Sequence, residues 1–177
     1  MTGNRECSLP ASPVRIAVAD PRGSLARACL RGYTAELAAR FPGGFDPAHS
    51  NPATDDDLTP PRGLLLVATR DGEPAGCGAV KFHPGAPAEI KRMWVAPAAR
   101  GLGLGRRLLA HLESHAAAAG ARVARLETNG ALSEAISLYR SAGYREVAPF
   151  NDERYAHHWF EKALAPPHPG PDGAVPG

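Results

Sequence analysis

The pattern of apolar and polar positions predicts a chain that changes from helix to strands and back. Residues 14–20 ("VRIAVAD") are typical of a first strand, and residues 23–41 carry apolar side chains at helical spacing before Pro42-Gly43-Gly44. Residues 46–62 form a long polar segment. Loops of this length in compact domains are usually lids, binding segments or disordered stretches, so we expect this one to border a site.

The next part of the chain has the pattern of strands. Residues 64–70 and 74–82 flank an Asp71-Gly72 turn and predict an antiparallel hairpin. Residues 88–95 ("AEIKRMWV") alternate as a third strand does. This alternation predicts two faces, one with Ile90, Arg92 and Trp94, the other with Glu89, Lys91, Met93 and Val95.

The last third of the chain returns to alternating helices and strands. A leucine stripe predicts a helix that starts near Leu104 and stops at Gly120, followed by a strand over residues 122–128. A short helix capped by Ser133 and stopped by Gly143 comes next, and residues 144–148 and 157–164 supply the last strands. The element order predicts an α/β (α+β) fold in which helices pack on a mixed sheet. We expect a single domain over residues 14–164, with flexible tails at 1–13 and 165–177.

Composition and charge exclude several classes of function. The 20 Lys and Arg residues nearly balance the 18 Asp and Glu residues and are scattered, which does not favour a nucleic-acid partner. Cys7, Cys29 and Cys77 are an odd number without short spacing, so neither a disulfide framework nor a zinc site is indicated. No apolar run of membrane-spanning length and no signal-peptide pattern is visible. We therefore expect a cytoplasmic protein without a membrane partner and without a metal.

Three glycines on alternate positions, Gly101, Gly103 and Gly105, lie between the third predicted strand and the leucine-striped helix. Glycines here let backbone N–H groups approach an anion, and the helix dipole adds to the attraction. A phosphate ligand is therefore expected. The dinucleotide fingerprint would need a third glycine at Arg106 or Leu108, and the phosphate-binding loop of nucleotide triphosphatases would need a Lys-Ser/Thr pair, so both patterns fail.

The segment Arg100-x-x-Gly103-x-Gly105 resembles the acyl-CoA loop of the GNAT superfamily of N-acetyltransferases, and residues 138–147 ("LYRSAGYREV") resemble that family's second signature. The resemblance extends over roughly residues 64–148. It implies a mixed, mostly antiparallel sheet of six to seven strands with helices on both faces and a central parallel pair that splays apart, with a bulge near Val95 to Ala96 as the wedge. The residues that the resemblance assigns to acetyl-CoA are Met93, Trp94, Val95, Arg100, Gly101, Leu102, Gly103, Leu104, Gly105 and Arg106.

Acyl transfer to an amine needs a base, an oxyanion donor and a proton for the leaving thiolate. Tyr139 occupies the family's tyrosine position and is the candidate acid, although its helical spacing also suits a buried core aromatic. Glu127 and Glu89 are the candidate bases, and either could instead be an ordinary ion-paired carboxylate. The backbone N–H near Val95 is the candidate oxyanion donor. Leu132 replaces the asparagine that many relatives carry seven residues before the tyrosine, and Asn129 lies three residues earlier.

Other residues could carry chemistry, but each has a simpler explanation. His111 and His115 lie one helical turn apart without a third metal ligand nearby. Cys77 could carry an acetyl group, yet it lies in an apolar strand. His157-His158 could line an acceptor site and Asp55 to Asp57 could attract a cationic amine, but exposed histidines and solvated loop charge are the favoured explanations.

The resemblance implies a cytoplasmic N-acetyltransferase that uses acetyl-CoA as co-substrate. The acetyl group would pass directly to a primary amine of a small molecule or peptide in a ternary complex. A non-catalytic acyl-CoA-binding or sensing module is the alternative, and a nicotinamide-nucleotide protein is a third interpretation. The sequence does not identify the acceptor, and it leaves monomer and homodimer open.

Overall fold

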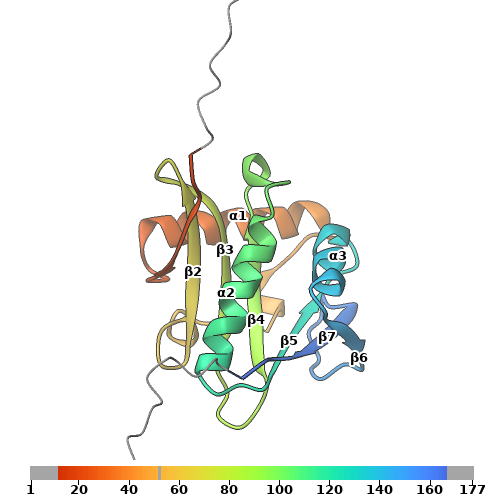
Figure 1. The fold of residues 1–177 in the computed structure, drawn as a ribbon. Coiled ribbons are helices and arrows are strands. Elements are labelled where there is room, and N and C mark those ends of the chain that lie inside the picture. Colours follow the sequence, from red (N-terminus) through yellow and green to blue (C-terminus); the bar gives the residue numbers. More distant parts are fainter. Residues whose placement is uncertain (1–11, 52, 167–177) are drawn as a thin grey trace, which may run out of the picture.

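A seven-stranded mixed sheet forms the centre of the molecule (Figure 1). The structure is a computed structural model that describes residues 12–51 and 53–166, so the predicted tails fall almost wholly outside the described residues. The strands are β1 (Arg15–Ala19), β2 (Gly63–Arg70), β3 (Glu73–Lys81), β4 (Ala88–Val95), β5 (Val123–Thr128), β6 (Arg145–Val147) and β7 (His158–Ala163). They follow the order β1-β2-β3-β4-β5-β7-β6, and β4–β5 is the parallel pair. The predicted fold class is confirmed.

Helices cover both faces of this sheet, as predicted. Helix α1 (Ser24–Arg40) packs over β2 and β3, where Cys29 joins a buried cluster with Leu65, Val67 and Cys77. Helices α2 (Leu104–Ala118) and α3 (Ser133–Ser141) pack on the opposite face around the main core. The polar segment after α1 contains the short 3-10 turns η1 (Pro47–His49) and η2 (Asp56–Leu58), and η3 (Pro97–Ala99) follows β4. No helix within the described ranges is both long and apolar enough to cross a membrane.

Glycines end the two later helices where the sequence places them. Gly120 and Gly143 have φ of +91° and +94°, in the left-handed region that glycine adopts without steric cost. The prediction that Ser133 caps α3 is wrong. Leu132 holds the N-cap position and no side chain caps the helix, whereas the Asn129 carboxamide oxygen accepts the amide of Ala131 at 2.9 Å.

Strands β4 and β5 are paired at one end and separate toward the other. Their parallel register includes Ala88 with Ala124 and Glu89 with Arg125 and does not continue beyond these pairs. The predicted splay is therefore present. It leaves backbone groups of the last residues of β4 without strand partners on that side.

The wedge is a bulge at Arg92, and the predicted position at Val95 to Ala96 is wrong. Trp94 pairs with Cys77 and Lys91 pairs with Ala79, so two residues of β4 lie opposite Gly78. Arg92 has φ of +58°, which a non-glycine residue rarely adopts. A Cβ on Gly78 would lie 2.7 Å from the Met93 sulfur, so glycine makes room for the extra residue.

The extra residue also changes which side chains share a face. Trp94 packs with the cluster under α1, whereas Met93, Val95 and Ile90 pack in the core under α2 and α3. Because Glu89 and Lys91 flank Ile90, they lie on the face of α1. The strict alternation read from the sequence, which placed Glu89 with Met93 and Val95, is therefore wrong.

Candidate active site

The turn between β4 and α2 presents a row of unused backbone amides. Gly101 and Gly103 have φ of +78° and +73°, and Gly103 is the N-cap of α2. Within the described part of the chain, none of the amides of residues 101–106 donates to a protein acceptor, and the first helical bond runs from Arg107 N to Gly103 O at 3.1 Å. Six amides at a helix N-terminus form a site suited to an anion.

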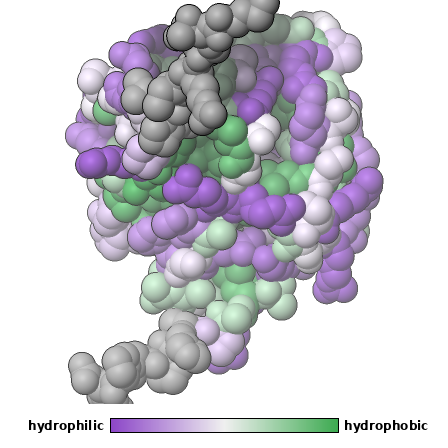
Figure 2. Space-filling model, turned by 45° about the horizontal axis from the view of Figure 1, so that its top comes forward, coloured by the Kyte–Doolittle hydropathy of each residue, from purple (hydrophilic) through white to green (hydrophobic). Residues whose placement is uncertain are grey.

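A cavity, here called the loop cleft, opens beside these amides. It is lined by the end of β4, the glycine turn, α1 and α3. Figure 2, which brings the top of Figure 1 forward, shows apolar surface recessed between hydrophilic side chains. The cleft contacts all the predicted cofactor residues except Leu102, which is exposed. The predicted cofactor residues that line the loop cleft are Met93, Trp94, Val95, Arg100, Gly101, Gly103, Leu104, Gly105 and Arg106.

Arginines and glutamates form the rim of the loop cleft. Arg100 donates through Nε to the Val95 carbonyl at 3.1 Å and through Nη2 to Glu36 at 2.6 Å. Arg40 bonds Glu36 at 3.1 Å and Glu134 at 2.8 Å, which links α1 to α3. The sequence did not single out Glu36 or Arg40, because their position over the cleft depends on how α1 crosses the sheet.

The Val95 amide points into the splay. Ala96 donates its amide to Ala75 of β3 at 2.9 Å. Because successive amides of a strand point to opposite edges, the amide of Val95 faces the β5 side, where pairing has ended. This geometry leaves it available as a hydrogen-bond donor.

Tyr139 reaches the junction between the loop cleft and a second cavity, here called the aromatic cleft. Its side chain lines both cavities, and the residue is 5% exposed. No described residue bonds its hydroxyl. Burial, followed by the influence of Tyr33 and Glu127, raises the pKa of Tyr139 well above that of a free phenol, so the hydroxyl keeps its proton at neutral pH.

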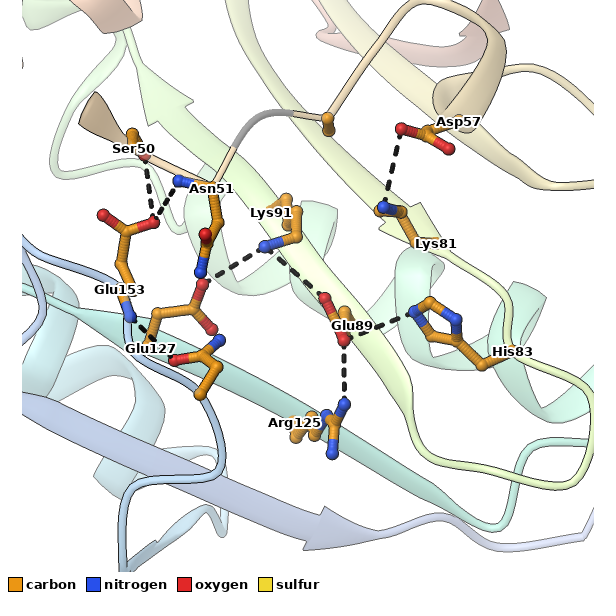
Figure 3. Close-up of polar contacts among 12 residues, drawn as sticks. Ser50, Asn51, Asp57, Lys81, His83, Glu89, Lys91, Arg125, Glu127 and Glu153 are labelled. Atoms are coloured by element: carbon orange, nitrogen blue, oxygen red, sulfur yellow. Dashed lines mark hydrogen bonds and ion pairs between the residues drawn. The ribbon is translucent and has the colours of Figure 1, made fainter. Parts of the chain in front are cut away.

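The two candidate bases belong to a square of alternating charges on β4 and β5 (Figure 3). Lys91 Nζ lies 3.1 Å from Glu127 and 3.5 Å from Glu89, and Arg125 Nη2 lies 2.8 Å from Glu89. The parallel register creates this square, because it sets Glu89 beside Arg125 and therefore Lys91 beside Glu127.

The surroundings of the two glutamates differ. Burial acts to raise the pKa of Glu89, but the Arg125 hydrogen bond and the charges of Lys91 and His83 outweigh it and lower the pKa. Glu89 lines neither cleft. Glu127 lines the aromatic cleft with Tyr139, and its Oε2 is buried without a hydrogen-bond partner among the described residues. The structure therefore brings Glu127, but not Glu89, to the cavity that Tyr139 enters.

The aromatic cleft has an apolar wall that the sequence did not reveal. Phe41, Phe45 and Tyr155 contact one another with ring centroids 4.9 to 5.8 Å apart. The Tyr155 hydroxyl also accepts the amide of Asp46 at 3.0 Å. The residues come from segments more than a hundred positions apart. The polar segment after α1 does border a site, as expected.

The Asn129 side chain is held by local hydrogen bonds. Its carboxamide nitrogen donates to the Tyr155 carbonyl at 2.7 Å, while its oxygen accepts from Ala131. Leu132 lines both clefts. Asn129 thus supports the loop that carries Tyr155.

The remaining candidates lie in ordinary structural surroundings. Cys77 is fully buried and its thiol donates to the Arg92 carbonyl at 3.3 Å, and the neighbouring Cys29 together with burial raises the pKa of this thiol. His157 accepts the amide of Gly130 at 3.1 Å, and His158 bonds Glu146 at 2.6 Å. Within residues 12–51 and 53–166, no three His, Cys, Asp or Glu residues cluster as metal ligands.

Comparison with known proteins agrees with this fold. Residues 31–144 match the model of the acetyltransferase (GNAT) family. An IAA acetyltransferase of Azospirillum brasilense is 42% identical over 113 residues, which cover 63% of this chain and 74% of that protein. An uncharacterized N-acetyltransferase of Schizosaccharomyces pombe is 35% identical over 117 residues, 60% of this chain and 70% of the relative. A GNAT acetyltransferase from Staphylococcus aureus Mu50 has the same fold, with a TM-score of 0.68 at 15% identity over 86% of this chain and all of that one.

The chain belongs to the GNAT family of acetyltransferases. It is therefore an N-acetyltransferase, and acetyl-CoA is the acetyl donor typical of its family. This membership favours the enzyme over the non-catalytic binding module, and the predicted resemblance is confirmed.

Proposed function

We propose that this enzyme transfers acetyl from acetyl-CoA directly to a primary amine while both substrates are bound. The observation that carries the proposal is the junction of the two clefts. Free amides of the glycine turn, those of Gly101 and of residues 103–106, border one cleft, Glu127 borders the other, and Tyr139 lines both. A covalent acetyl-enzyme at Cys77 is disfavoured, because that thiol is fully buried under α1.

In this proposal, the amides of residues 101–106 bind the diphosphate of the donor, and the helix dipole of α2 strengthens the contact. Arg100 and Arg106 add positive charge at the rim of the loop cleft. Residues 93–95 pair with the pantetheine arm as an added strand would, because the splay frees that edge of β4. Acetyl-CoA supplies the activated thioester.

Two side chains and one backbone amide each have a separate role in the proposed reaction. Glu127 takes a proton from the acceptor ammonium, directly or through a water, so that the neutral amine forms a bond to the carbonyl carbon. The Val95 amide donates to the developing oxyanion. As the carbon–sulfur bond breaks, Tyr139 gives its proton to the leaving sulfur. The nitrogen loses its second proton to solvent as the amide forms, and solvent returns a proton to Tyr139.

A thiol-release assay with acetyl-CoA and a panel of amines tests the proposal. Tyr139→Phe and Glu127→Gln should each lower kcat by about 10²- to 10⁴-fold, while calorimetry shows unchanged acetyl-CoA binding. Tyr144→Phe is the matched control: Tyr144 is equally buried but borders neither cleft, and its activity should be retained. Full activity of both active-site variants would refute the assigned roles.

The cytoplasmic location stays a prediction from the sequence, which leaves both the acceptor and the choice between monomer and homodimer open.

A further inference from the structure

Arg92 is the extra residue of the β4 bulge, and it lines both the aromatic cleft and a further cavity between α1 and the segment from Ala53 to Asp55. Its guanidinium carbon lies 5.6 Å from the centre of the Tyr33 ring, and Nη2 donates to the Ala53 carbonyl at 3.3 Å. A left-handed φ of +58° costs free energy at an arginine, and such strain is concentrated at functional sites. The strain raises the question of what the guanidinium does there.

Not every charged group that lines the aromatic cleft has a partner of opposite charge. Lys91 contacts the carboxylates of Glu127 and Glu89. Glu153 accepts three hydrogen bonds from two loops, at 2.7 to 3.2 Å. Arg92 has no carboxylate within 4.0 Å among the described residues, although Glu127 offers one buried and unpartnered oxygen. The cleft therefore holds an arginine without a counter-ion and a carboxylate oxygen without a donor.

We propose that the acceptor is a free amino acid with a large apolar side chain, an inference that rests on the proposed acetyl transfer. Arg92 binds the carboxylate of the acceptor. Glu127 receives its ammonium next to Tyr139, and the apolar side chain packs against the rings of Phe41, Phe45 and Tyr155.

Three physical features support this assignment. A guanidinium is planar and can hold a carboxylate with two parallel hydrogen bonds, and the cation–π contact with Tyr33 together with the hydrogen bond to Ala53 restricts its position before binding. An acceptor with one positive and one negative group satisfies both unmatched groups of the cleft, whereas a simple amine leaves Arg92 without a counter-ion. The aromatic wall then buries apolar surface, which favours bulky side chains over small ones.

The test is a thiol-release assay with acetyl-CoA and matched sets of acceptors. Each set holds a free amino acid, its carboxamide and the corresponding amine without the carboxylate, such as phenylalanine, phenylalaninamide and phenethylamine. The proposal predicts that the free amino acid with a bulky apolar side chain has a kcat/KM about 10- to 100-fold above that of its carboxamide, the scale of a charge-assisted bidentate contact. Equal or better use of the carboxamide would overturn the proposal.

The variant Arg92→Gln separates recognition of the carboxylate from support of the loop at Ala53. It should remove most of the preference by lowering kcat/KM for the amino acid alone. A uniform loss on all three acceptors would instead assign Arg92 a structural role and would also overturn the proposal. As a control, Arg145→Gln removes an exposed charge on β6 and should leave the preference for the free amino acid over its carboxamide unchanged.

Failure of this inference can be distinguished from failure of the proposed function. If no amino acid gives thiol release but other amines do, the substrate class is wrong and acetyl transfer stands. If calorimetry detects no acetyl-CoA binding, both the proposed acetyl transfer and the proposed acceptor class are refuted.

Discussion

Replacing Gly103 by alanine tests whether the shape of the glycine turn, and not its lack of side chains, is what the donor requires. A Cβ on Gly103 would meet no atom within 4 Å, so alanine causes no clash. The φ of +73° is the obstacle, because left-handed backbone costs a non-glycine residue about 1–2 kcal/mol.

This cost should be seen in binding of the donor. Since the amides of residues 101–106 have no protein acceptors, the free turn can relax to a less strained shape in Gly103→Ala. Binding must then restore the original shape, and we expect the Kd for coenzyme A to rise by about 5- to 30-fold. Isothermal titration calorimetry measures this directly.

Gly85 provides a matched control. Its φ of +72° is nearly identical, a Cβ there also meets nothing within 4 Å, and it lies in the turn before β4, at the opposite end of that strand from the glycine turn. Gly85→Ala should bind coenzyme A as the wild type does. A Kd within twofold of the wild-type value for Gly103→Ala would refute the role given to this turn.

Three further predictions concern stability. Glu89 has a lowered pKa, so its ion pair with Arg125 stabilises the fold above the ordinary glutamate pKa and is lost as the pH falls. Arg125→Met should lower the free energy of unfolding, measured with urea, by about 1–3 kcal/mol near pH 7 and by much less near pH 3. Gly32→Ala should lower Tm although alanine favours helices, because the new Cβ would lie 2.4 Å from Trp94 and overpacking costs about 1–3 kcal/mol. Burial raises the pKa of Tyr33 to about 12, so between about pH 10 and pH 12 the folded state keeps a proton that the unfolded chain loses. The free energy of unfolding should therefore fall across that range by up to about 1.4 kcal/mol per pH unit. Tyr33→Phe should make this fall less steep.

Each of these predictions has a matched control or a contradicting result. Arg140→Met removes an exposed pair with Glu146 and should leave the free energy of unfolding almost unchanged at either pH. A rise in Tm for Gly32→Ala would show that Trp94 yields without cost. An unchanged alkaline slope in Tyr33→Phe would show that this tyrosine titrates normally in the folded state.

The sequence predicts those parts of the fold that depend on local chemistry. Gly101 and Gly103 need left-handed backbone, and Gly120 and Gly143 end helices, so each residue type indicates its conformation wherever the rest of the chain lies. The order of strands and helices follows from hydrophobic period in the same way. The helix ends and the order of elements were predicted correctly, whereas the left-handed backbone of Gly101 and Gly103 is a finding of the structure.

The features that escaped prediction depend on pairing between distant segments. The bulge at Arg92 exists because β4 pairs with β3 opposite Gly78, and no local pattern in β4 distinguishes it from the expected site near Val95. The bulge puts Ile90 on the same face of β4 as Met93 and Val95, and so places Glu89 on the opposite face. The registers of β4 and β5 likewise decide that Lys91 meets Glu127.

The composition of the aromatic cleft was beyond sequence reasoning for the same reason. Phe45 and Tyr155 belong to segments without a recognised motif, and only the folded chain brings them together. Tyr33 appeared in the sequence as one member of an apolar helix stripe. Its place above the splay, beside Tyr139 and Arg92, follows from the crossing of α1 over the sheet.

A crystal structure of the protein with acetyl-CoA tests the central claim most directly. We predict diphosphate oxygens within hydrogen-bond distance of the amides of residues 101–106, and the thioester in the splay between Val95 and the hydroxyl of Tyr139. A donor bound with its diphosphate away from this turn, or with its thioester outside the splay, would contradict the account.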